Sequence, residues 1–262
     1  MLQYEKIPGG LRMKKKVMFY TILAVLLGVF VFSAYQLGSY WMAKVRSDQL
    51  LNEASQFVGL GGNQNQENNE QGEDTNTGDP EQIEVDFAAM AELSDDIVAW
   101  IYCPNTQINY PVVQSYDNDY YLYHLMDGSW NANGTIFMDY RNEDDFSDYN
   151  TMIYGHHMKT GAMFADLMKY KSQSYYEEHP YMYIYTPEQN YRLELFAACI
   201  VDCVADIYDF EPSAAVIEEC IRNSTFDAAL DYPANHIVTL STCTYEYDDA
   251  RYVVLGDLIP IE

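Results

Sequence analysis

The sequence contains few basic residues. Lys and Arg together number 14 among 262 residues, against 40 Asp and Glu, and the formal net charge at pH 7 is -26. Proteins that follow a phosphate backbone need clustered Lys and Arg side chains. Nucleic acid is therefore excluded from the expected partners. Apolar residues are not scarce, because 48% of the chain is hydrophobic and 15% aromatic, which excludes a wholly disordered protein.

The basic residues are also unevenly placed. Seven of the 14 lie at or before Arg46, where Glu5 is the single acidic residue, which leaves 7 basic and 39 acidic residues for the rest of the chain. The negative electrostatic field of such an acidic segment favours cationic or amine-bearing partners, and the charge also keeps an exported domain soluble. We interpret the charge mainly as a source of solubility.

Charged residues are absent from residues 17–43 altogether. This run exceeds the roughly 20 apolar residues that cross a bilayer as a helix. The alternative, a cleaved signal peptide, would carry an apolar region of about 7 to 15 residues and an A-x-A-like cleavage site. Because such a site is missing, we expect residues 17–43 to form a transmembrane signal anchor.

The charges beside this run predict its orientation. Three lysines at positions 14–16 precede it, whereas only Lys44 and Arg46 follow it closely. Basic residues concentrate on the cytoplasmic side of a membrane helix. We therefore expect residues 1–16 to be a basic cytoplasmic N-terminus of a single-pass protein in the cell membrane, with the remaining chain outside the cell.

The amino-acid composition changes twice after the expected anchor. Residues 47–60 place apolar side chains at helical spacing, which predicts a short amphipathic helix that prolongs the stalk. Residues 61–82 contain no aromatic residue and no Lys or Arg, so they cannot recover the entropy lost on ordering. We expect residues 44–82 to be an extracellular stalk and disordered linker, and residues 83–262 to be a folded catalytic domain.

This folded domain is expected to be mainly β. After a predicted helix near residues 83–93, short runs of branched and aromatic residues alternate with Asn, Asp, Gly and Pro. The predicted strands are 97–102, 108–113, 135–138, 151–154, 182–185, 192–201, 236–241 and 252–259, and further helices are predicted at 119–125, 163–169 and 213–222. Most connections are too short for helical crossovers, so we expect a barrel with peripheral helices.

The cysteines are odd in number. A domain outside the cell favours disulfides, but five cysteines leave at least one thiol free, and no C-x-x-C pair supports a zinc site. Cys199 and Cys203 lie on one face of a predicted strand, which is poor geometry for a bond between them. We interpret Cys103, Cys199, Cys203 and Cys220 as small buried hydrophobic residues.

Cys243 differs because it closes the run 237–243 at an expected strand end. A thiol becomes a useful nucleophile when a neighbour takes its proton or stabilises its thiolate. His156 and His157 follow a predicted strand and can reach across to another strand end, but adjacent residues of an extended chain point to opposite sides, so only one of them can face Cys243. A hairpin of the last two strands would bring Arg251 near Cys243, where a guanidinium can hold an oxyanion. A structural histidine and a surface ion pair are the alternative interpretations.

These residues resemble a known family. The run TLSTC at 239–243, Arg251 eight positions later and the run YGHHM at 154–158 resemble the sortases, and class B sortases in particular. Further class B signatures occur in the expected order across the domain, at residues 105–106, 108–114, 134–139, 150–158 and 163–164.

The resemblance implies an eight-stranded sortase-type β-barrel and a cysteine transpeptidase on the outer face of a Gram-positive membrane. Carried over to this chain, it implies Cys243 as the nucleophile, His156 as the acid and base, and Arg251 as the cation that holds the oxyanion. Four further residues fall on positions that line the groove for the sorting signal: Asn109, Val113, Tyr154 and Ser241.

The resemblance also implies partners. We expect exported proteins that carry a C-terminal sorting pentapeptide of the LPXTG or NPXTN kind, cleaved after Thr through a thioester, and a peptidoglycan precursor amine as acceptor. The chain departs from one class B pattern at Thr244, where an acidic residue would follow the nucleophile. The alternatives are a pilin-polymerising sortase with a lysine acceptor and a non-catalytic, membrane-tethered binding module.

No cofactor or metal is expected. The acidic run at residues 143–145 is a conceivable calcium site, but it lacks the regular ligand spacing of an EF-hand. We interpret it as a solvated loop.

Overall fold

The computed structural model describes residues 9–60, 79–228, 236–244 and 246–261. The chain divides into two compact units, Met1–Arg46 and Ser47–Glu262. Most of the expected disordered linker, residues 61–78, lies outside the described residues. The second unit begins well before residue 83, where the sequence predicts the start of the folded domain.

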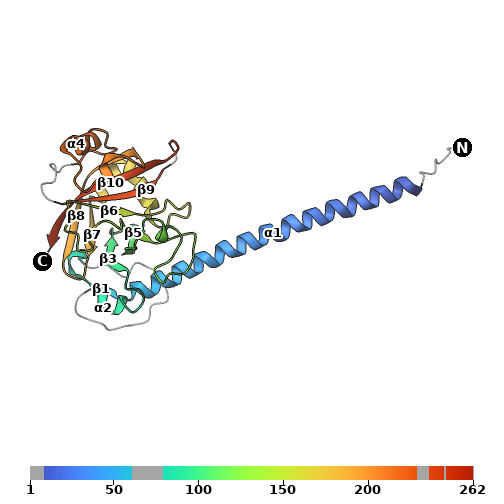
Figure 1. The fold of residues 1–262 in the computed structure, drawn as a ribbon, viewed down its shortest axis with the longest axis horizontal. Coiled ribbons are helices and arrows are strands. Elements are labelled where there is room, and N and C mark those ends of the chain that lie inside the picture. Colours follow the sequence, from blue (N-terminus) through green and yellow to red (C-terminus); the bar gives the residue numbers. More distant parts are fainter. Residues whose placement is uncertain (1–8, 61–78, 229–235, 245, 262) are drawn as a thin grey trace. The chain divides into compact units, whose positions relative to one another are not determined.

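The N-terminal helix α1 spans Gly9–Ser55 (Figure 1). Within the described part of the chain it is the one helix long and apolar enough to cross a membrane, with a mean hydropathy of 2.4 and none of its apolar window buried. Large apolar side chains such as Leu26 and Phe30 are exposed along it. Length and composition therefore meet the requirement for a membrane-spanning helix.

The second unit is built on a closed barrel of eight strands in the order β10-β8-β7-β3-β4-β5-β6-β9 (Figure 1). The strands are β3 Ile97–Tyr102, β4 Asn109–Val113, β5 Ile136–Met138, β6 Asn150–Tyr154, β7 Tyr181–Tyr185, β8 Asn190–Asp202, β9 Ile237–Cys243 and β10 Ala250–Ile261. Neighbours are antiparallel except for the β4–β5 and β6–β9 pairs, which are parallel. The predicted eight-stranded barrel is confirmed.

Strand β9 shows how the alternation of side chains positions the site. Val238 and Leu240 point to the core inside the barrel, whereas Ile237 belongs to a second apolar cluster on its outside. Because successive side chains of a strand face opposite ways, Ser241 and Cys243 share the outward face with Ile237. The nucleophile expected from the sequence therefore lies on the outer surface of the barrel, at the end of a strand that is otherwise buried.

The first residues of the second unit pack onto the barrel. β1 (Val58–Leu60) pairs with β2 (Ile83–Val85), and Leu50 and Ala54 of α1 are buried in the same apolar cluster as Trp100. The helix predicted from residue 83 starts only at α2 (Phe87–Met90), where the Asp86 carboxylate accepts a hydrogen bond from Ala89 N. The pairing with β1 makes the preceding residues a strand, so that part of the prediction is wrong.

Helices occupy several connections between the strands. α4 (Ala214–Arg222) matches its prediction, and α3 (Gln173–Glu178) was not predicted. The expected helices near 119–125 and 163–169 are 3-10 helices, η2 (Tyr120–Leu122) and η3 (Phe164–Lys171). Two further 3-10 turns are η1 (Pro80–Gln82) and η4 (Asp206–Tyr208).

The cysteine interpretation needs correction. Cys199 on β8 and Cys220 on α4 form a disulfide with a Cα–Cα distance of 5.6 Å, and Cys203 is exposed. Only Cys103 is a buried free thiol, as expected. The disulfide depends on α4 packing onto the outside of β8, where Ile217 and Cys220 face the strand. No local sequence pattern encodes that packing.

Candidate active site

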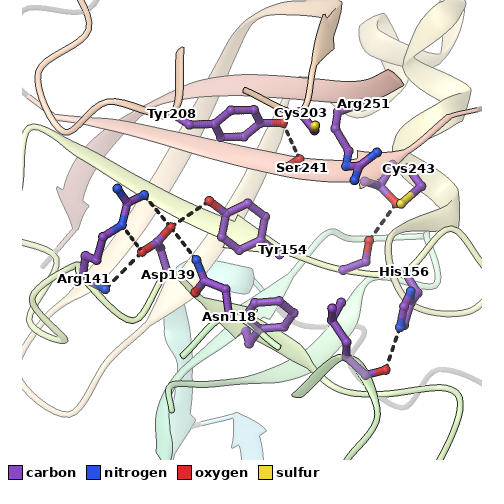
Figure 2. A pocket seen from close by; sticks show the side chains of 14 residues that line it. Asn118, Asp139, Arg141, Tyr154, His156, Cys203, Tyr208, Ser241, Cys243 and Arg251 are labelled. Carbon is purple, nitrogen blue, oxygen red and sulfur yellow. Dashed lines mark hydrogen bonds and ion pairs between the residues drawn. The ribbon is translucent and has the colours of Figure 1, made fainter. Parts of the chain in front are cut away.

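A pocket of about 340 Å³ opens on the outside of the barrel, where β6 and β9 end and β10 begins (Figure 2). It is lined by Asn118, Leu122, Phe137, Asp139, Arg141, Tyr154, Gly155, His156, Cys203, Tyr208, Ser241, Thr242, Cys243 and Arg251. Five of the seven site residues expected from the sequence are among them. They come from segments far apart in the chain, and the barrel brings them together.

Arg251 lies directly opposite Cys243 in the antiparallel β9–β10 pair. Side chains directly opposite each other in such a pair project from the same face of the sheet. Figure 2 accordingly draws the Arg251 guanidinium beside the Cys243 side chain. Among the described residues, Arg251 donates one hydrogen bond, from Nη1 to the Ala250 carbonyl at 3.1 Å. Most of its donors therefore remain available to a bound group.

His156 reaches the pocket because hydrogen bonds join the residues at the ends of β6 and β9. Gly155 N donates to Ser241 O at 3.1 Å, and Thr242 Oγ1 donates to Gly155 O at 2.7 Å. A Cβ at Gly155 would lie 2.7 Å from the Phe164 ring, so this close approach requires glycine. Gly155 therefore lies close to the end of β9 and to the Phe164 ring, and the next residue, His156, borders the pocket.

The imidazole of His156 has a fixed orientation. Its Nε2 lies 2.8 Å from Leu122 O, and its ring is 6.4 Å from that of Tyr123. A carbonyl only accepts hydrogen bonds, so Nε2 carries a proton, and Nδ1 is the ring nitrogen that this bond leaves free.

His157 occupies a different position. Its Nδ1 lies 3.1 Å from the backbone carbonyl of Cys243, and it forms a bridge with Met163. It is not among the described residues that line the pocket. The two adjacent histidines therefore face different surroundings, as the alternation of an extended chain predicts.

The three free thiols differ in their surroundings. Burial raises the pKa of Cys103 to about 11, and its Sγ lies 3.7 Å from Tyr170 Oη, away from the pocket. Partial desolvation, followed by the charges of Asp202 and Asp249, raises the pKa of Cys203. Cys203 and Cys243 both border the pocket that contains His156, but it is Cys243 that lies directly opposite the Arg251 residue in the β9–β10 pair. A thiol so placed is suited to nucleophilic attack.

Tyr154 and Ser241 form one wall of the pocket with Tyr208. Ser241 Oγ lies 2.8 Å from Tyr208 Oη, and the Tyr154 and Tyr208 rings are 6.1 Å apart. Burial raises the pKa of Tyr208 to about 12, so its hydroxyl stays protonated at neutral pH. This wall continues from Cys243 toward Asp139 and Arg141 and is aromatic with a polar edge.

Asn109 and Val113 have no part in the described lining of this pocket. Asn109 Oδ1 accepts a hydrogen bond from Trp100 Nε1 at 2.7 Å, and Val113 is fully buried beside Phe137. The reason is the direction of β4: one of these residues begins the strand, and the other points into an apolar cluster at its end. The structure therefore does not bring these two residues to the pocket that contains Cys243.

The pocket also contains residues that the sequence did not indicate: Asn118, Leu122, Arg141, Cys203 and Tyr208. One signal was available, because Asp139 and Arg141 are charged residues that directly follow a buried strand. The others lie in connections, whose spatial position depends on the whole barrel. In the described part of the chain, no group of three or more His, Cys, Asp or Glu side chains is placed to hold a metal ion.

A thiol at a strand end with an imidazole and a guanidinium in one pocket defines a site for cysteine-dependent acyl transfer. A family model described as a sortase domain matches residues 101–259. The chain is 32% identical over 251 residues to sortase B of Listeria monocytogenes, covering 91% of this chain and 96% of that protein.

Solved structures agree with the sequence comparison. A Bacillus anthracis protein similar to sortase B superposes with a TM-score of 0.65 at 30% identity, covering 83% of this chain and 98% of that chain. Staphylococcus aureus sortase B complexed with triglycine superposes with a TM-score of 0.60 at 30% identity, covering 67% and 86%. The chain belongs to the sortase family, and within it to class B. It is a cysteine transpeptidase.

Proposed function

We propose that this transpeptidase cleaves a C-terminal sorting pentapeptide of the LPXTG or NPXTN kind after its Thr and transfers the exported protein to a peptidoglycan amine. The observation that carries the proposal is the β9–β10 register, which sets Arg251 opposite Cys243 in the pocket that also contains His156.

In the first step the Cys243 thiolate attacks the carbonyl carbon of the Thr residue. The tetrahedral oxyanion that forms is stabilised by Arg251 together with a backbone N–H. The C–N bond then breaks, and His156, which holds the proton taken from the thiol, gives it to the departing amine. A thioester between the substrate Thr and Cys243 remains.

In the second step an amine attacks the thioester carbonyl. His156 accepts a proton from the amine, the C–S bond breaks, and the Cys243 thiol is restored as a new amide bond forms. The structure of S. aureus sortase B with triglycine supports an amine of this kind as acceptor. The acidic balance of the chain, -26 overall, also favours a cationic acceptor.

Tyr154 and Ser241 are proposed to contact the sorting peptide, because they line the wall that extends from Cys243. The aromatic ring of Tyr154 offers an apolar surface to the peptide side chains. Asn109 and Val113 are left out of the proposed binding site, since neither borders the described pocket.

Helix α1 is proposed to be the membrane anchor, with residues 17–43 in the bilayer. The lysines at positions 14–16 favour a cytoplasmic N-terminus and an extracellular catalytic unit. This placement supports the proposed reaction, because exported proteins and peptidoglycan precursors then meet the pocket on the same side.

A peptide library tests the proposal. Full-length protein in detergent is incubated with pentapeptides of the sorting type, with triglycine or a lysine side-chain amine as acceptor, and products are identified by mass spectrometry. We expect cleavage after Thr and an amide product with triglycine. Cleavage with transfer to lysine alone would favour a pilin-polymerising enzyme, and no cleavage of any peptide would contradict the proposal.

A further inference from the structure

The proposed reaction makes no use of a buried carboxylate at the edge of the pocket. Asp139 directly follows β5 and is fully buried, although it borders the pocket. Burying a charged group is unfavourable unless it is paired and hydrogen-bonded. The surroundings of Asp139 therefore indicate what this charge does.

Both oxygens of Asp139 are occupied by donors. Oδ1 accepts from Arg141 Nε at 2.8 Å and from Arg141 N at 3.0 Å. Oδ2 accepts from Arg141 Nη2 at 2.9 Å, from Tyr154 Oη at 2.8 Å and from Asn118 Nδ2 at 2.9 Å. Burial alone would raise the pKa of Asp139, but these hydrogen bonds lower it below the ordinary value. Asp139 is therefore an ionised acceptor (Figure 2).

All three side chains that donate to Asp139 line the pocket. Two of them, Tyr154 and Arg141, also pack against aromatic residues. The Tyr154 ring packs 6.1 Å from that of Tyr208, whose hydroxyl is bonded to Ser241. The Arg141 guanidinium lies 5.1 Å above the Phe210 ring. Tyr208 and Phe210 belong to the connection between β8 and β9, so Asp139 indirectly holds this connection against the barrel.

We propose that Asp139 is a positioning residue for peptide recognition, which fixes Asn118, Arg141 and Tyr154 as the wall that binds the sorting signal upstream of the scissile bond. This inference rests on the proposed function. None of the hydrogen bonds recorded for Asp139 in the described chain goes to Cys243, His156 or Arg251. Its loss therefore weakens binding and leaves the reacting groups in place.

The role requires a carboxylate and not merely a polar group of the same size. The Asp139 carboxylate accepts all five of the hydrogen bonds that its side chain makes, so both of its oxygens must be acceptors. In Asp139→Asn one oxygen becomes an NH₂ group, which then faces an Arg141 guanidinium N–H that cannot accept a hydrogen bond. The wall then loses its fixed arrangement while the volume of the side chain is unchanged.

The test compares Asp139→Asn with wild type in the full-length protein, with a pentapeptide that wild type cleaves. We expect KM for the peptide to rise about 10-fold or more, since charge-assisted hydrogen bonds are lost. We expect kcat and the rate of Cys243 alkylation by iodoacetamide to stay within about 2-fold of wild type. The lost contacts bind the peptide equally well in the ground state and in the transition state.

The matched control is Asp148→Asn. Asp148 lies in the same loop and accepts hydrogen bonds from Asn142 Nδ2 and Glu143 N, but it does not border the described pocket. We expect its KM to equal that of wild type. A second variant, Tyr154→Phe, keeps the ring and removes one donor to Asp139, and we expect a rise in KM of about 3-fold even if Asp139→Asn folds poorly.

The outcomes separate this inference from the proposed function. Cleavage by wild type with an unchanged KM in Asp139→Asn and in Tyr154→Phe would overturn the inference alone. An equal rise in KM in Asp148→Asn would also overturn it, because the effect would then be a general loss of loop structure. No cleavage by wild type would overturn the proposed function and this inference with it.

Discussion

At the scale of single residues, the reactivity proposed for Cys243 depends on neighbours that the barrel supplies. His156 enters from the loop after β6, and Arg251 from the opposite strand β10. A free thiol elsewhere in the chain, such as buried Cys103, has an elevated pKa and no imidazole recorded beside it in the described structure. Position, and not the cysteine alone, creates the nucleophile.

The two adjacent histidines provide a first prediction. We expect His156→Ala to lower turnover of a sorting peptide by about 100- to 10,000-fold, which is the usual contribution of a general acid and base. We expect His157→Ala to retain most activity, because His157 contacts the Cys243 carbonyl from outside the described pocket. Steady-state kinetics measure both variants, with circular dichroism as the control for folding. Equal losses in two folded variants would contradict these roles.

Arg251→Lys tests whether charge alone is sufficient. A lysine ammonium cannot reproduce the planar fork of a guanidinium, so we expect a loss of turnover of about 100- to 1,000-fold, the effect of one oxyanion donor. Arg251 is partly exposed, and an exposed charge contributes at most about 1 kcal/mol to stability, so the melting temperature should barely change. Near-normal turnover would reduce Arg251 to a general electrostatic role, and a large fall in melting temperature would make it structural.

The residues of the site differ in how far the sequence reveals them. Cys243, His156 and Arg251 each lie at the end or start of a predicted strand. Pairing of these strands brings the three residues together, so their proximity could be expected from the sequence. Asn118 and Arg141 each lie in a connection between strands and meet only through Asp139, from which they are 21 and 2 positions away in the sequence. Periodicity does not describe such connections, so the contacts between these side chains could not be predicted.

At the scale of elements, the disulfide joins α4 to the barrel. Cys199 and Cys220 are 21 residues apart, and closing a loop of this size stabilises a protein by on the order of 3 kcal/mol. We expect a reductant to lower the melting temperature of wild type by about 6 to 12 °C. The Cys199→Ala/Cys220→Ala double variant should melt at the lower temperature with or without reductant. A double variant that responds like wild type would contradict this contribution.

Truncation tests where the folded unit begins. A chain that starts at Ser47 keeps Leu50, Ala54 and the β1–β2 pair, whereas one that starts at Ile83 loses all of them. We expect the shorter chain to be less stable by about 3 kcal/mol or more, since buried apolar side chains are removed. Urea unfolding measures the difference, and peptide turnover checks that the site survives in both chains. Equal unfolding midpoints would show that residues 47–82 add nothing to the core.

The elements also show which parts of the fold are predictable. All eight barrel strands could be located because each is a run of branched and aromatic residues between turn residues. The strand β2 was mistaken for the start of a helix, because its partner β1 lies more than 20 positions away and no local pattern reports that pairing. The disulfide was missed for the same reason, since it follows from the packing of α4 on β8.

At the scale of the whole molecule, the distribution of charge and apolar residues fits an enzyme of exported substrates. Seven basic residues lie at or before Arg46, beside the apolar run at residues 17–43, and the remainder carries a large acidic excess. In the proposed arrangement the helix fixes the enzyme at the membrane, where peptidoglycan precursors are attached. The acidic excess keeps the catalytic unit soluble and favours amine acceptors.

The central claim is that Cys243 forms a thioester with the sorting signal. The most direct measurement is the intact mass of the full-length enzyme after acid quenching of a reaction with a cleavable sorting peptide and no acceptor amine. We predict a mass increase equal to the peptide fragment that ends in Thr minus one water, located on Cys243 by fragmentation, absent in Cys243→Ala and removed by triglycine. Peptide cleavage that continues in Cys243→Ala, or product formation with the adduct on another residue, would contradict the account.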